Sequence, residues 1–174
     1  MIKNLKFQQG FTIMEVLAVI FIISFGLLGV MSLVNQNVQV GYINHNNIIA
    51  SQLCQESLEL CRNIRDNNWL AGNNWKTGIN SATNIIQDGT YAIDYMGITN
   101  VTNINDPLAK LYIDSNSFYR HLVTPGTAIT TAFSRTITVK TETAASTTLE
   151  CAVQWQTGQN IHHFITQTVL YDWR

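Results

Sequence analysis

Charge is scarce in this chain of 174 residues, of which only 12% are Asp, Glu, Lys or Arg. Globular domains usually carry about twice that share. Ten Lys and Arg residues stand against eleven Asp and Glu residues, without a visible basic patch. Proteins that bind nucleic acid by neutralising its backbone phosphates need such a patch, so we expect no direct nucleic-acid binding. The length favours one ordinary domain with an appendage.

Proline is also rare, with two residues in the chain, the first of them Pro107. Proline is the residue that most strongly breaks a helix, so its absence permits one continuous helix from about Thr12 to Asp66. Within that range Gly26, Gly29 and Gly41 are the candidate weak points.

Enzyme signatures are missing as well, including a Ser, His and Asp arrangement, a glycine-rich phosphate loop and the G-x-S-x-G motif. His162 and His163 are adjacent, so on a strand they point to opposite faces and do not readily share a metal ion. Asp114 and Asn116 resemble a fragment of a calcium loop, but the full acidic spacing is absent, which favours a β-turn. We therefore expect no enzyme activity, no cofactor and no metal site.

Cysteine occurs three times, as Cys54, Cys61 and Cys151. On a helix, Cys54 and Cys61 would lie about 10.5 Å apart along the axis, whereas a disulfide needs Cα atoms within about 7 Å. Cys151 could pair with Cys54 or with Cys61 in an oxidising compartment. The alternative is that all three are small apolar packing residues, and both alternatives stay open.

Against these absences stands one long apolar run. No charged residue occurs from Val16 to Val34, and as a helix this segment would be about 28 Å long, close to the roughly 30 Å hydrocarbon thickness of a bilayer. Glu15 lies at the edge of the run, where a carboxylate is costly in a membrane. We therefore expect the carboxylate of Glu15 to have a positively charged partner.

The run is preceded by a short leader with two lysines that ends in Gly10, after which Phe11, Glu15 and the apolar helix follow. This arrangement resembles the N-terminal signal of type IV pilins and pseudopilins. In that family a membrane peptidase cuts after the glycine and methylates the new N-terminal amine. The resemblance implies cleavage between Gly10 and Phe11, N-methylation of Phe11, and an assembly role for Glu15. The carboxylate of Glu15 would neutralise the amine of a neighbouring subunit and set the stagger between helices.

Beyond Val34 the pattern becomes that of an amphipathic helix, which we expect to end near Asn67. Its predicted apolar face comprises Ile43, Ala50, Cys54, Ser57, Leu58, Cys61 and Ile64. Trp69 and Trp75 follow in a turn-rich segment. We expect them to cap the helix end or the sheet edge; stacking on a sugar is the alternative.

From about Asp88 onward the sequence alternates as strands do. In one segment Arg135, Ile137 and Val139 alternate with Thr136, Thr138 and Lys140. In the next, one side is formed by Leu149, Cys151, Val153 and Trp155. The turn TGQN and the following run IHHFITQTVLYDW predict a hairpin. We expect four to six short antiparallel strands whose apolar face is covered by the amphipathic half of the helix.

The predicted fold is therefore α+β and pilin-like, with a protruding apolar half-helix and an amphipathic half packed on an antiparallel sheet. The expected organisation is a leader at residues 1–10, a membrane or filament-core segment at 11–34, the amphipathic half-helix at 35–67 and a β-rich head at 68–174.

The resemblance implies a structural subunit of a type IV pilus or a secretion-type pseudopilus, with a minor subunit favoured. Adhesion, motility, secretion and DNA-uptake filaments all belong to this class. Its partners would be other pilin subunits, the prepilin peptidase and methyltransferase, and an inner-membrane assembly platform. The precursor would cross the bacterial inner membrane once, with a cytoplasmic leader and an extracytoplasmic head, before it enters the filament. The alternative is a single-span, membrane-anchored extracytoplasmic binding protein.

Overall fold

The computed structural model describes residues 10–77, 88–121 and 127–173. One long helix precedes an antiparallel sheet, so the α+β, pilin-like architecture is confirmed. Two compact units divide the chain, Met1–Asn44 and His45–Arg174. The elements in chain order are α1 (Ile13–Leu70), β1 (Gly89–Asp94), β2 (Gly97–Asn100), the 3-10 helix η1 (Pro107–Ala109), β3 (Lys110–Ile113), β4 (Tyr119–Arg120), β5 (Ile129–Thr143), β6 (Ser146–Thr157) and β7 (Asn160–Tyr171).

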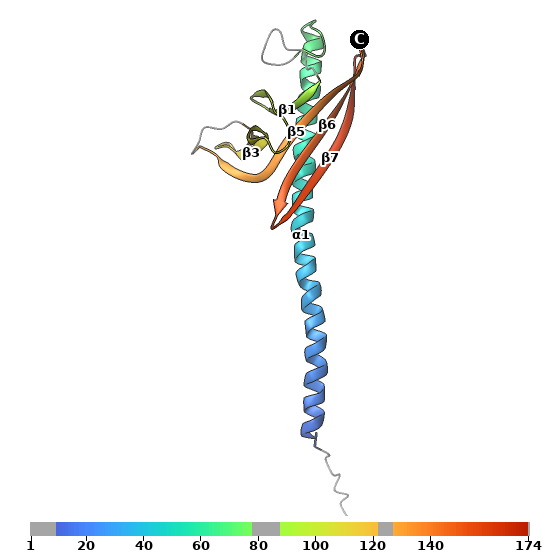
Figure 1. Cartoon of the computed structure of the whole chain (residues 1–174), viewed down its shortest axis with the longest axis vertical. Coiled ribbons are helices and arrows are strands. Elements are labelled where there is room, and N and C mark those ends of the chain that lie inside the picture. Colours follow the sequence, from blue (N-terminus) through green and yellow to red (C-terminus); the bar gives the residue numbers. More distant parts are fainter. Residues whose placement is uncertain (1–9, 78–87, 122–126, 174) are drawn as a thin grey trace, which may run out of the picture. The chain divides into compact units, whose positions relative to one another are not determined.

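Helix α1 runs without interruption through both units (Figure 1). Its three internal glycines each cost about 1 kcal/mol relative to alanine, yet none of them ends the helix. In the first unit every side chain from residue 11 to residue 42 is exposed. The stretch from Val16 to Gln55 contains no Asp, Glu, Lys or Arg. The helix ends at Leu70, slightly later than the expected end near Asn67.

In the second unit, one face of α1 packs against the sheet, as the amphipathic pattern predicts. Ile43 is only half buried, so the buried face starts later than expected. On β6 every second residue from Leu149 to Trp155 points into the same core. The buried residues of α1 are Ala50, Leu53, Cys54, Ser57, Leu58, Cys61, Ile64 and Trp69.

Strand β5 organises the sheet. It pairs with β6 along one edge, and with β3 and β1 in succession along the other. Outside these pairs, β7 lies next to β6, β2 next to β1 and β4 next to β3, all antiparallel. In Figure 1, β5, β6 and β7 form a long twisted ribbon beside the C-terminal part of α1.

The expected number and length of strands were wrong. Seven strands occur in the described ranges, and β5, β6 and β7 contain 15, 12 and 12 residues. The β5–β6 pairing is in register from Ser134 opposite Gln154 to Thr141 opposite Thr147, and the β6–β7 pairing runs from Ser146 opposite Tyr171 to Thr157 opposite Asn160. The predicted β6–β7 hairpin is present, and its two-residue loop begins at Gly158, whose φ is 61°.

A buried arginine joins the helix to the sheet. Arg135 on β5 is 0% exposed. Its Nη1 donates to the Leu53 carbonyl at 2.9 Å and to Glu56 Oε2 at 3.0 Å, and its Nη2 donates to the Ile93 carbonyl at 2.6 Å. A fully desolvated cation is tolerated only where such acceptors meet it. Arg135 therefore holds α1, β5 and β1 in one arrangement.

Candidate functional site

The residues with a predicted processing role lie at the start of α1. Gly10 and Phe11 precede the helix, and Phe11 is 82% exposed. The leader residues 1–9 lie outside the described part of the chain. The peptide bond that joins Gly10 to Phe11 therefore sits in accessible, non-helical backbone directly before the first helical turn.

Thr12 caps this helix. Its Oγ1 accepts a hydrogen bond from the Glu15 amide at 3.2 Å, and its carbonyl accepts from the amides of Glu15 and Val16. A Thr side chain in this place satisfies one of the amides that a helix start leaves without a partner. We did not predict this role from the sequence, although the pattern T-x-x-E at Thr12–Glu15 is a recognised signal for a helix start.

Glu15 occupies the first turn of α1 and is exposed. The positive end of the helix dipole favours a carboxylate in that turn. None of the ion pairs among the described residues involves Glu15. Its carboxylate is thus available to a partner outside this chain, and the role predicted for it remains a prediction.

The segment that follows has the properties of a membrane span. Within the described ranges, α1 is the one helix that is long and apolar enough to cross a bilayer, and the qualifying window is not buried in the structure. A glutamate at the edge of such a run, with accessible residues before it, is an arrangement that suits processing at a membrane surface.

The three cysteines lie in the second unit as buried free thiols. Cys54 and Cys61 share the inner face of α1, and Cys151 faces them from β6. The Ser57 hydroxyl is 3.3 Å from Cys151 Sγ and donates to the Cys54 carbonyl at 3.0 Å. The packing role is therefore present, and pairing of Cys151 remains a prediction.

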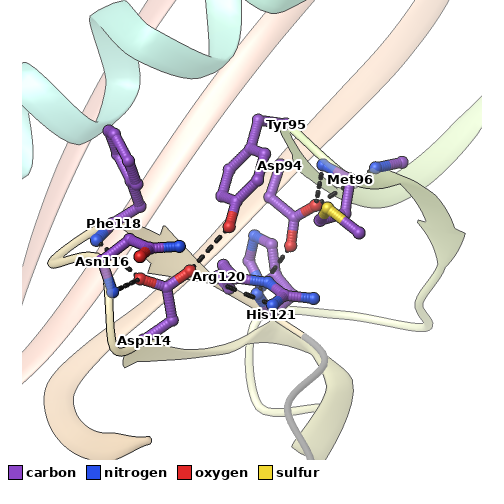
Figure 2. A network of polar contacts seen from close by, with 9 residues as sticks. Asp94, Tyr95, Met96, Asp114, Asn116, Phe118, Arg120 and His121 are labelled. Carbon is purple, nitrogen blue, oxygen red and sulfur yellow. Dashed lines mark hydrogen bonds and ion pairs between the residues drawn. The ribbon is translucent and has the colours of Figure 1, made fainter.

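Asp114 forms a turn, as expected, and its carboxylate is fully engaged. Figure 2 shows Tyr95 pointing its hydroxyl at Asp114 Oδ2, at 2.6 Å, while Oδ1 accepts from the amides of Asn116 and Phe118. The Tyr95 hydrogen bond and these amides lower the pKa of Asp114 below its ordinary value. In the described residues, no group of three or more His, Cys, Asp or Glu side chains could hold a metal ion.

The remaining candidates have structural roles. Trp69 and Trp75 are both 6% exposed and belong to the hydrophobic core at the end of α1, which fits the predicted cap role better than stacking on a sugar. The Trp69 indole donates to Asp172 Oδ1 and packs edge-on against Trp173. His162 stacks on Trp155, whereas His163 is exposed on the other face of β7.

Comparison with known proteins adds one finding. Residues 5–31 match the model of the prokaryotic N-terminal methylation motif. No curated protein and no solved structure matches the chain.

The matched segment contains Gly10, Phe11, Thr12 and Glu15, and it extends well into the apolar part of α1. Proteins with this motif are structural, are processed by a prepilin peptidase and assemble with other pilin subunits. Together with the apolar helix, the motif fits a membrane-anchored pilin. The chain therefore carries a type IV pilin-like prepilin signal on an α+β, pilin-like architecture.

Proposed function

We propose that the chain is the precursor of a structural subunit of a type IV pilus or of a secretion-type pseudopilus. One observation carries the proposal: the methylation motif coincides with accessible, non-helical residues directly before a capped helix whose following segment is free of charge. A leader of residues 1–10 is removed after Gly10, and the amine of Phe11 is then methylated.

The geometry before the helix supports cleavage at this bond. Residues inside a helix have their backbone groups engaged in internal hydrogen bonds, and a peptidase must free them before it can bind the chain in an extended form. The first such bonds of α1 are accepted by Thr12. Gly10 and Phe11 lie before them, so the helix does not need to unwind for the cut.

Cleavage creates a new charge beside Glu15. The Phe11 amine would be a cation, and methylation of an amine retains its charge. An isolated ionic group is costly in a bilayer or in an apolar filament core, and removing either partner of a buried ion pair is strongly unfavourable. Glu15 of one subunit pairs with the Phe11 amine of its neighbour in our proposal, which fixes the axial stagger between their helices.

The apolar half of α1 has two successive environments in this scheme. It spans the inner membrane before assembly, with the leader in the cytoplasm and the head outside. After an assembly platform extracts the subunit, it packs laterally against other pilin helices. Both environments favour the same exposed apolar surface. A minor subunit is the assignment that the Trp-rich head favours, and quantitative mass spectrometry of purified filaments should find it at low stoichiometry.

The mature N-terminus tests the proposal. Mass spectrometry on protein from cells that contain the leader peptidase should find N-methylated Phe11 as the first residue, and cells without the peptidase should retain the leader. A retained leader in both strains, or cleavage elsewhere, would refute processing and favour a membrane-anchored binding protein.

Substitution of Glu15 tests the register role. Glu15→Ala and Glu15→Leu should leave cleavage intact and reduce incorporation into filaments. Glu59→Ala is the matched control, because Glu59 is an exposed glutamate of the same helix that pairs with Arg62. If both Glu15 variants entered filaments as efficiently as wild type, the proposal that Glu15 sets the axial stagger would be refuted.

A further inference from the structure

We infer that Cys54 and Cys151 form a disulfide in the mature protein, which fastens helix α1 to strand β6, and that Cys61 remains a thiol. The inference rests on the proposed function in one respect, the oxidising compartment in which an exported head folds. It assigns a modification to two side chains that otherwise serve only as packing residues.

Cys151 meets helix α1 at the turn that contains Cys54 and Ser57. The Ser57 Oγ is 3.0 Å from the carbonyl oxygen of Cys54 and 3.3 Å from Cys151 Sγ. The Cys54 thiol itself donates a hydrogen bond to the Cys151 sulfur. Both side chains are 0% exposed. Cys54 and Cys151 are therefore hydrogen-bonded neighbours within the buried core.

The backbone at both positions is well held. Cys151 pairs with Ile137 of β5 on one side and with Thr166 of β7 on the other. Cys54 lies in the interior of α1, and the Arg135 guanidinium binds the carbonyl of the preceding residue, Leu53. The cysteines therefore meet at fixed positions on two elements.

Cys61 is the less suitable partner. It lies two turns further along α1 than Cys54, beyond Ser57, and its thiol has no hydrogen bond to the Cys151 sulfur among the described contacts. The pKa values of Cys54 and Cys61 are both raised, that of Cys54 more, so acidity does not distinguish the two candidates. The hydrogen bond between Cys54 and Cys151 does.

In the folded head, Cys151 is the more acidic thiol of the pair. Its hydrogen bond with Cys54 lowers the pKa of Cys151, as do its contact with Ser57 and the nearby Arg135 cation, whereas burial raises it. The hydrogen bond to Cys151, followed by burial, raises the pKa of Cys54. Contacts that form early in folding would therefore favour Cys151 over Cys54 as the attacking thiol.

The reaction is thiol–disulfide exchange with a donor RSSR, either oxidised glutathione or the disulfide of a thiol oxidoreductase. The Cys151 thiolate attacks one donor sulfur, a Cys151–SR bond forms, and the first RS⁻ leaves. Cys54 then gives its proton to this RS⁻ and attacks the Cys151 sulfur. The second RS⁻ leaves and takes up the proton that Cys151 lost. Together the two cysteine thiols lose two electrons, and the donor RSSR is reduced to two RSH. Because both cysteines are buried, the exchange takes place while the head folds.

The experiment uses the full chain in detergent micelles, isolated from the membranes of an exporting host with immediate alkylation of free thiols. A protease that cleaves after glutamate separates Cys54 from Cys61, because Glu56 and Glu59 lie between them. Mass spectrometry should find the Cys54 peptide joined to the Cys151 peptide and Cys61 alkylated. Cys61→Ala should keep the link, whereas Cys54→Ala and Cys151→Ala should lose it.

A second experiment tests whether the same disulfide forms without export of the chain. The full chain is unfolded, reduced and refolded in micelles with a mixture of oxidised and reduced glutathione, and the same peptides are analysed. A link through Cys61, or free Cys54 and Cys151 in refolded protein, would overturn the inference. The N-terminal residue of the cellular sample is determined in parallel. Methylated Phe11 together with free Cys54 and Cys151 would refute the disulfide but not the processing. An intact leader together with a Cys54–Cys151 link in the refolded protein would refute the processing but not the disulfide.

Discussion

Replacement of Arg135 by methionine should strongly destabilise the second unit. Methionine retains much of the side-chain volume but removes the cation and all of its donors. The carbonyls of Leu53 and Ile93 then lose their guanidinium partner in the core, and an unsatisfied buried group costs about 1–3 kcal/mol. The loss of the ion pair with Glu56 adds less to this cost, because the Glu56 side chain is 38% exposed and its carboxylate can be solvated by water instead. We therefore expect Arg135→Met to lower the free energy of unfolding by about 3 kcal/mol.

Arg120→Met is the matched control. It makes the same chemical change in the same sheet, but the Arg120 side chain is 25% exposed and its Nη1 lies 3.9 Å from Asp114 Oδ2. Loose, partly solvated pairs of this kind contribute about 1 kcal/mol or less. Arg135→Lys should fall between the two variants, since one ammonium group replaces a planar fork of donors.

Urea titration of the full chain in micelles measures the effect. Unfolding is followed by tryptophan fluorescence, to which Trp155 in the core of β6 contributes from a fully buried position. The midpoint of Arg135→Met should fall at an unchanged denaturant slope. A loss below about 1 kcal/mol, or a loss equal to that of Arg120→Met, would show that the buried guanidinium does not hold the helix to the sheet.

Three further predictions address acid stability, the helix start and the hairpin. Burial, followed by the nearby Arg135 cation, lowers the pKa of His121 to about 4. Because its ordinary value is about 6.5, the unfolded chain binds this proton first. Stability contributed by neutral His121 is then present above pH 6.5 and is lost as the pH falls towards 4, by about 3 kcal/mol; His121→Gln should show a smaller loss in urea titrations between these pH values. Thr12→Val removes the cap and should make amide exchange at Glu15 about five times faster in micelles, at a cost of about 1 kcal/mol, whereas Thr12→Ser should behave as wild type. Gly158→Ala should destabilise the head by about 1 kcal/mol, since the φ of 61° is strained for alanine although its Cβ would meet nothing within 4 Å. Gln159→Ala in the same loop should have no measurable effect, and equal midpoints for these two loop variants would contradict the argument.

Features with a one-dimensional pattern could be predicted from the sequence. The apolar run, the amphipathic face of α1 and the inward residues of β6 all follow from periodicity, because a regular element repeats its orientation at a fixed spacing. The processing residues were recognisable because Gly10, Phe11 and Glu15 occupy a short, fixed arrangement. The cap at Thr12 lay within the same stretch and could also have been predicted.

Features that depend on how the elements meet could not be predicted. The alternation of β5 placed Arg135 on the same face as Ile137 and Val139. It did not reveal the acceptors of Arg135, which lie on distant parts of the chain: Leu53, Glu56 and Ile93. The choice between Cys54 and Cys61 as the neighbour of Cys151 likewise depends on the position of α1 along the sheet. Periodicity assigns a face to a residue, whereas packing decides which residues face each other.

The charge-free stretch of α1 from Val16 to Gln55 has a consequence for movement along the helix axis. A helix with ionised residues near its middle is held at one depth in a bilayer, because sliding would drag those groups through hydrocarbon. Along this stretch the residues beyond Val34 are mainly amides and aliphatics, so no ionised Asp, Glu, Lys or Arg fixes the depth. Movement towards the cytoplasmic side would carry only neutral side chains and His45 into the bilayer until Glu56 reached it. Withdrawal towards the head side instead brings Glu15 into the hydrocarbon at once, so the free energy needed to extract the subunit rises from the first turn unless a neighbouring subunit supplies a cation.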